Sequence, residues 1–151
     1  IIPIDGLQIS RSLQKHLKRF SIRVDSCFAQ VMKACGDPRR PHGWINVDFI
    51  RAYSYLHAMG WADSVEVFSG DDLVGGVYGV RVGKLFAGES MFHTQTDASK
   101  AALVALVALL DATGIALFDV QWTTPHLESM GAIDIPRSDY LALLAQAQNR
   151  D

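Results

Sequence analysis

Apolar and polar residues alternate with two different periods along this chain, and the two periods predict where its strands and helices lie. Between residues 64 and 92 the apolar positions form three short runs, separated by turns at 70–72 and 82–84, which is typical of strands. On either side, apolar residues recur at helical spacing between capping residues and glycines. The first expected helix begins at a Ser10 cap, and another begins at Asn46 or Asp48 and ends at Gly60. The other expected helices are 27–35, 98–112, 126–130 and 137 to about 149. The expected strands are 20–25, 64–68, 73–82, 85–92 and 115–121.

The helix expected over 98–112 differs from the others because it is apolar nearly all round. Thr96 or Asp97 is its expected cap and Gly114 its end, and such a helix should be buried. The segment 20–25, in contrast, alternates as a half-buried strand does. The three consecutive strands predict an antiparallel meander. We therefore expect one domain over residues 1–151 of the α/β (α+β) class, with a mixed, mostly antiparallel sheet flanked by helices.

Composition supports a folded domain. The chain has 151 residues, of which 49% are hydrophobic and 20% charged, and its formal net charge is −2, so low hydrophobicity and charge repulsion do not prevent a core. The longest apolar run, residues 101–110, is about half of what a bilayer-spanning helix needs. No secretory leader is recognisable, so we expect a cytoplasmic protein with no membrane contact. Cys27 and Cys35 lie about 12 Å apart along one helix, which is too far for a disulfide, and are expected to be reduced.

The small net charge conceals an asymmetry along the chain. Residues 1–51 hold nine Lys and Arg against four acids, whereas residues 52–151 hold five against twelve. No acid interrupts the basic stretch 11–24, and such a stretch suits a partner that carries phosphates. A solvated helix face is the alternative explanation and stays open.

Common catalytic motifs are absent from the sequence. It has no Gly-rich phosphate loop, no Cys-x-x-Cys pair and no two histidines at ligand spacing, so we expect neither a metal nor a nucleotide-hydrolysing site. Gly88-Glu89-Ser90 begins like the nucleophile elbow of serine hydrolases, and Asp119 with His126 would complete the order of the triad. The closing glycine, however, is Phe92, which argues against the sharp turn that an elbow requires.

Three polar residues next to apolar segments are candidates for chemistry. Glu89 lies inside a strand of apolar neighbours, so its carboxylate must be paired, exposed at an edge, or functional. Asp119 and Gln121 are two residues apart after the apolar run 115–118, and on a strand both would point to the same face. The carboxylate could serve as a general base, and the amide could orient it or donate to an oxyanion. Structural roles in turns or caps remain the alternative.

Taken in order, several motifs resemble one family, the leucyl/phenylalanyl-tRNA–protein transferases. The resemblance covers nearly the whole chain, and Gly-Glu-Ser-Met-Phe followed by Ala-Ser-Lys is its most specific part. The matching segments are 9–12, 64–67, 73–79, 86–92, 98–100, 119–121, 126–132 and 135–137.

This resemblance implies an enzyme that moves Leu or Phe, and Met less well, from aminoacyl-tRNA to the N-terminal Arg or Lys of a protein, which marks that protein for degradation. It also implies a GNAT-like acyltransferase fold and no metal or diffusible cofactor. We further expect a monomer. Asp119 and Gln121 match the reaction centre of the family, and Glu89 matches its conserved motif. The implied apolar pocket draws on Val77, Phe86, Met91, Leu106, Leu110 and Phe118, with Phe68 where the family often has Trp; the implied tRNA contacts are Arg11, Lys15, Lys18 and Arg19.

One departure from the family keeps two alternatives open. The family usually carries a smaller N-terminal segment with Gly-Gly-Asp-Leu and Trp-Trp-x-Pro stretches, and neither stretch occurs in this sequence. A catalytically incomplete domain that binds tRNA or a degradation-signal peptide is therefore one alternative. An acyl-CoA-dependent N-acetyltransferase is the other, although the Gln/Arg-x-x-Gly-x-Gly/Ala loop that would cradle the pyrophosphate of coenzyme A is not found.

Overall fold

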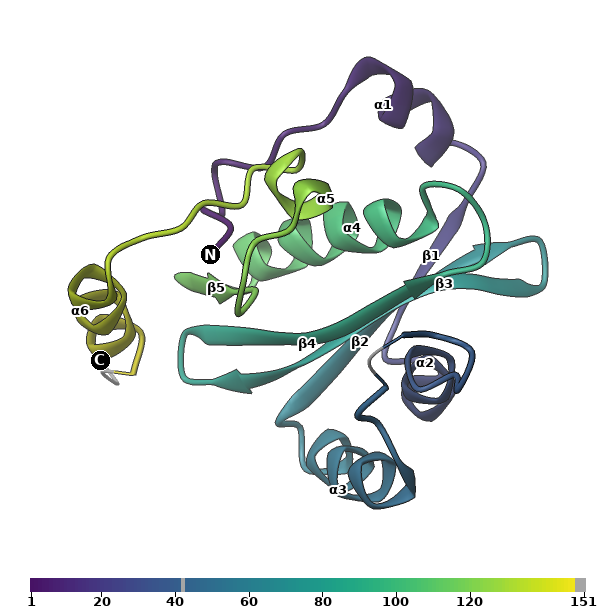
Figure 1. The fold of residues 1–151 in the computed structure, drawn as a ribbon, viewed down its shortest axis with the longest axis horizontal. Helices are drawn as coiled ribbons and strands as arrows, with labels where there is room; N and C mark the ends of the chain where they lie inside the picture. The colour runs from purple at the N-terminus through teal and green to yellow at the C-terminus, as the bar shows by residue number, and fades with distance from the viewer. Residues whose placement is uncertain (42, 149–151) are drawn as a thin grey trace.

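A single five-stranded sheet organises the computed structural model, which describes residues 1–41 and 43–148 (Figure 1). The strands lie side by side in chain order, and each neighbouring pair is antiparallel except β4 and β5, which are parallel. The expected class and the meander are thereby confirmed. The strands are β1 (Ser21–Val24), β2 (Ala62–Ser69), β3 (Asp72–Val82), β4 (Leu85–His93) and β5 (Leu117–Asp119).

Helices cover both faces of this sheet (Figure 1). On one face, α4 lies across the strands, and α1 and α5 lie beyond it; on the other face are α2 and α3, and α6 packs at the end of the sheet near β5. None of the helices in the described part of the chain is long and apolar enough to cross a membrane. The helices are α1 (Arg11–Leu17), α2 (Phe28–Cys35), α3 (Val47–Ala58), α4 (Ala98–Ala112), α5 (Pro125–Glu128) and α6 (Arg137–Gln148).

The helix α4 forms the centre of the core, as its all-round apolar sequence predicted. Eight of its 15 residues are buried, and they pack against β2, β3 and β4. The close approach depends on Gly75, because a Cβ there would lie 2.7 Å from the Cβ of Ala98. The predicted caps hold at Ser10, which accepts from the backbone N–H of Leu13, and at Asn46.

Some local predictions were wrong. Asp97 is the N-cap residue of α4, as one of the two expected candidates, but its side chain makes no capping bond: its backbone is left-handed (φ +67°), and its carboxylate contacts His16 and Lys100. The strand β1, predicted to be half-buried, is exposed along its whole length, since it lies at an edge of the sheet and packs mainly against β2. The strand predicted over 115–121 is reduced to β5. The predicted end of the last helix, Asn149, lies outside the described residues. The expectation for the cysteines is confirmed, because both are free thiols.

Candidate active site

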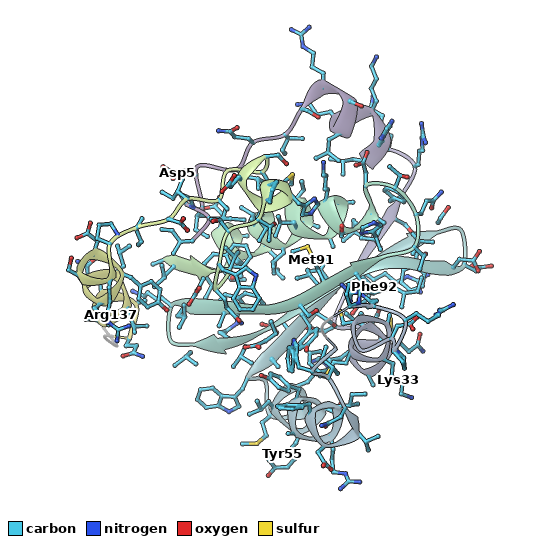
Figure 2. The ribbon with its side chains drawn as sticks, in the orientation of Figure 1. Asp5, Lys33, Tyr55, Met91, Phe92 and Arg137 are labelled. Atoms are coloured by element: carbon cyan, nitrogen blue, oxygen red, sulfur yellow. The ribbon has the colours of Figure 1, made fainter. Side chains whose placement is uncertain are left out.

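The candidate site lies where β4 and β5 separate. Backbone pairing joins 85–87 of β4 to 117–119 of β5 and goes no further. Beyond that point the two segments enclose a cavity of about 300 Å³. Figure 2 shows the Met91 side chain on the α4 side of β4 and the Phe92 side chain beside α2, so that alternate residues of β4 serve the cavity and the core. The cavity is lined by Arg40, Val77, Gly88, Glu89, Ser90, Met91, Phe118, Val120, Gln121, Trp122, Thr124, His126 and Leu127.

Glu89 reaches this cavity because β4 bulges at that residue. Tyr78 pairs with Ser90 and the next residue, Gly79, pairs with Gly88, so Glu89 is an extra residue without a partner on β3. A Cβ at Gly79 would lie 2.3 Å from the carbonyl oxygen of Ala87, so the bulge requires a glycine opposite it. Burial raises the pKa of Glu89, although hydrogen bonds from Tyr53 and Gln121 oppose the shift. The bulge therefore supplies a half-buried carboxyl group with a raised pKa.

Gln121 is positioned by a turn, and the predicted extended geometry does not occur. Its backbone is left-handed, with φ +72°, and its N–H donates to Oδ1 of Asp119 over 2.7 Å. Its side-chain Nε2 donates to the carbonyl oxygen of Gly88 over 2.9 Å. The amide thus crosses the gap between the separating strands, and it meets Glu89 there.

Asp119 is held from a second side by the last helix. The hydroxyl of Tyr140, on α6, donates to Oδ2 of Asp119 over 2.7 Å. Burial, together with this bond, raises the pKa of Tyr140 to about 12. Both carboxylate oxygens of Asp119 therefore accept a hydrogen bond, and this fixes the orientation of the carboxylate.

A second cavity, of about 310 Å³, lies on the other side of Gln121. Gln121 and Trp122 line both cavities, whereas Asp119 lines only the second. Two carboxylates, those of Asp119 and Asp134, face one basic residue, Arg137, in this lining. The other lining residues are Ile1, Ile133, Ile135 and Tyr140. The second cavity combines acidic and apolar walls, which suits a cation on an aliphatic stem.

The structure divides the apolar residues that the sequence assigned to the pocket. Val77, Met91 and Phe118 line the first cavity. Phe68 does not: it is buried on β2 beneath the guanidinium of Arg23, 4.3 Å from the ring centre. The structure places the others in the core behind the cavity wall, where they support it: Phe86, Leu106 and Leu110.

Two further predictions concern Ser90 and the basic helix. Ser90 lies within β4, opposite Tyr78, so it does not occupy a strand-to-helix turn and forms no nucleophile elbow. Burial and the charges of Lys100 and His93 lower the pKa of His126, which lines the first cavity.

The four basic residues are exposed on α1 and the turn after it, and none forms an ion pair within the described residues: Arg11, Lys15, Lys18 and Arg19.

Sequence reasoning missed four residues at this site. Tyr140 and Tyr53 lie inside helical segments where an aromatic residue is usually part of the core, and Arg40 lies in a loop outside the basic run. Trp122 follows Gln121 directly and is 69% exposed. That exposed tryptophan beside two polar candidates was the one available signal, because a large exposed aromatic often marks a binding surface.

Two solved structures with a similar fold are acetyltransferases of low sequence identity to this chain. An aminoglycoside acetyltransferase from an uncultured soil metagenomic sample superposes with a TM-score of 0.57 at 11% identity, covering 88% of this chain and 89% of that one. A ribosomal-protein-alanine N-acetyltransferase from Brucella melitensis biovar Abortus gives 0.54 at 14% identity, covering 78% and 93%. These likenesses confirm the expected GNAT-like fold, and at this identity they establish the fold alone.

Sequence relatives identify the family. The leucyl/phenylalanyl-tRNA–protein transferase from Cereibacter sphaeroides is 52% identical to this chain, and the alignment covers 97% of this chain and 69% of the relative. The enzyme of the same name from Maricaulis maris is 50% identical, over 97% of this chain and 70% of the relative. The enzyme of the same name from Tolumonas auensis is 49% identical over 99% of this chain and 66% of its own length. The family model described as leucyl/phenylalanyl-tRNA protein transferase matches residues 1–145. The chain therefore belongs to the leucyl/phenylalanyl-tRNA protein transferase family.

Proposed function

We propose that this chain transfers the aminoacyl group of Leu-, Phe- or Met-tRNA to the N-terminal amine of a protein that begins with Arg or Lys. One observation carries the proposal: Gln121 lines both cavities, with Glu89 in the mainly apolar first cavity and Asp119 in the acidic second one. A reaction that joins an apolar acyl group to a cationic residue needs such a pair of sites on either side of its reacting atoms.

The donor fits the first cavity by shape and by charge. Val77, Met91 and Phe118 offer an apolar wall of the kind that a Leu, Phe or Met side chain would bury against. The ester carbonyl would then lie at the polar edge, beside Glu89 and Gln121. The exposed basic residues of α1 would bind phosphates of the tRNA, because they carry positive charge that no acid in the described structure neutralises.

The acceptor fits the second cavity. Asp119 and Asp134 attract a cationic Arg or Lys, and Ile133 and Ile135 offer apolar surface to the aliphatic stem. The α-amine would reach the first cavity past Gln121, which borders both cavities. In this arrangement the nucleophile would lie beside the ester.

The chemistry follows from the hydrogen bonds already made. The amine nitrogen forms a bond to the ester carbonyl carbon, the bond from that carbon to the ribose oxygen breaks, and a proton moves from the amine to the leaving ribose oxygen. Because Nε2 of Gln121 donates to the carbonyl oxygen of Gly88, Oε1 is the amide atom that would accept from the attacking amine. This differs from the oxyanion donor that the sequence suggested. Asp119 fixes the turn that carries Gln121, and its charge favours an ammonium nearby. An aminoacyl ester is already activated, so alignment supplies much of the acceleration.

A transfer assay tests the proposal directly. Labelled Phe should pass from charged tRNA to a peptide that begins with Arg, and the Asp119→Ala variant should lose this activity. A stable analogue of aminoacyl-adenosine should raise the melting temperature, whereas coenzyme A should not. Stabilisation by coenzyme A without any aminoacyl transfer would favour the acetyltransferase alternative and refute the proposal. Binding of the analogue without transfer would indicate a catalytically incomplete domain.

A further inference from the structure

The first cavity contains a positive charge that the proposed reaction does not use. Three of its lining residues have ionisable side chains: Arg40, Glu89 and His126. Burial lowers the pKa of His126, the third ionisable residue, and so disfavours its charged form. Arg40 is therefore the permanent cation of this wall.

The loop that carries Arg40 leaves its charge unneutralised. The nearby acid, Asp37, is occupied by Arg39, whose Nη2 lies 2.6 Å from Oδ2 and whose Nε and backbone N–H also donate to the carboxylate. No carboxylate is within ion-pair distance of Arg40 in the described residues. Its guanidinium binds two neutral carbonyl oxygens, which orient it and do not cancel its charge.

Those two carbonyls also fix where the guanidinium lies. Nη1 donates to the carbonyl oxygen of Cys35, at the end of α2, over 2.9 Å, and Nη2 donates to that of Met91 over 2.8 Å. Met91 lies on β4 beyond the last residue paired with β5, so its carbonyl is at the open side of the cavity. Arg40 is thus a pre-oriented cation at the mouth, and its bonds to the two carbonyl oxygens use two of its five N–H groups.

We propose that Arg40 binds the 5′-phosphate of the terminal nucleotide of the aminoacyl-tRNA. The inference rests on the proposed function, and it adds a specific contact for the donor. With the aminoacyl side chain against Val77 and Met91 and the ester beside Gln121, the ribose occupies the mouth, and the nearest phosphate of the donor is attached to that ribose. A guanidinium matches a phosphate in charge and in geometry. The basic residues of α1, on the other face of the sheet from α2, remain for phosphates farther along the tRNA (Figure 1).

Two stable donor analogues separate this contact from every other. The first is adenosine with phenylalanine attached to its ribose through an amide, and the second is the same compound with a 5′-phosphate. We expect the wild-type protein to bind the phosphorylated analogue at least tenfold more tightly, since hydrogen bonds between charged groups contribute about 1.5–3 kcal/mol. Arg40→Ala should abolish this ratio and leave the affinity for the unphosphorylated analogue unchanged. Arg40→Lys should retain part of it.

Arg39→Ala is the matched control, because Arg39 lies in the same loop, is paired with Asp37 and does not line the cavity. It should leave the ratio intact. Arg40→Ala should also reduce the slope of log affinity against log salt for the phosphorylated analogue by about 0.7.

Three results would overturn the inference: equal affinity of the wild-type protein for the two analogues, an equal loss for both analogues in Arg40→Ala, or the same loss in Arg39→Ala. An equal loss for both analogues would mean that Arg40 acts by holding the Met91 carbonyl. If the phosphate preference is present and depends on Arg40 but no aminoacyl transfer occurs, the phosphate contact stands and the proposed function fails.

Discussion

Replacing Asp119 by Asn removes one charge from the centre of the site and keeps the shape of the side chain. In the wild-type protein Oδ1 accepts from the backbone N–H of Gln121 and Oδ2 accepts from the hydroxyl of Tyr140, each over 2.7 Å. The Asn oxygen can still accept from Gln121, and the phenol can rotate to accept from the new amide. The left-handed turn at Gln121, which is strained for a residue other than glycine, should therefore persist.

The expected loss follows from that single missing charge. A hydrogen bond to a charged partner contributes about 1.5–3 kcal/mol, which corresponds to about a 10- to 150-fold decrease in kcat/KM for a peptide that begins with Arg. Asp119→Ala should lose more, because it also frees the N–H of Gln121. The melting temperature of Asp119→Asn should stay close to that of the wild type, so that the loss is catalytic.

The assay measures transfer of labelled Phe from charged tRNA as a function of acceptor and donor concentration. Asp134→Asn is the matched control, because Asp134 lines the same cavity but its carboxylate accepts a hydrogen bond from Thr123 and does not hold the turn of Gln121. Its effect should be smaller by at least fivefold. Full turnover of Asp119→Asn with unchanged pH dependence would refute the assignment of Asp119. An equal loss in Asp134→Asn would show that the total charge of the cavity matters and not the position of Asp119.

Three other predictions concern the carboxyl groups and thiols of the structure. The pKa of Glu89 is raised in the folded state, so as the pH rises the unfolded chain loses this proton first. The carboxyl group therefore lowers the stability of the fold at neutral pH, and this effect disappears as the pH falls from the folded pKa to 4.5. The acid limb of the transfer rate should have its midpoint above 4.5, and Glu89→Gln should abolish that limb. Glu66 is fully buried, and its carboxylate accepts from the N–H and hydroxyl of Ser26 and from the hydroxyl of Ser64. Glu66→Leu should therefore lower the free energy of unfolding, measured by urea titration, by about 1–3 kcal/mol. A loss below about 0.5 kcal/mol, on the order of a surface substitution, would contradict the role of these bonds. Burial raises the pKa of Cys35 to about 11, so a thiol reagent at pH 8 should label Cys27 first in the native protein and both cysteines in denaturant; rapid native labelling of Cys35 would contradict this.

The course of the chain through helices and strands could be predicted from sequence because short-range patterns determine it. Ser10 and Asn46 cap their helices as expected, the turns after β2 and β3 lie at their glycines, and the all-round apolar α4 is buried. The family resemblance also followed from sequence, because Gly-Glu-Ser-Met-Phe and Asp-x-Gln stand together in so few contexts. The candidates Glu89, Asp119 and Gln121 came from the same source, and the structure brings all three to one place.

Only the tertiary structure decided how these residues meet and which side chains form the cavity walls. The bulge at Glu89 depends on the register between β3 and β4, and the cavity exists because β5 stops pairing after Asp119. Whether Phe86 or Phe118 faces that space depends on strands distant in sequence, so residue type alone could not separate core from pocket. Tyr140 reaches Asp119 from α6, and Arg40 reaches Met91 from a loop 51 residues away. Local patterns specify elements, whereas long-range packing specifies the contacts between them, and the chemistry of this protein depends on those contacts.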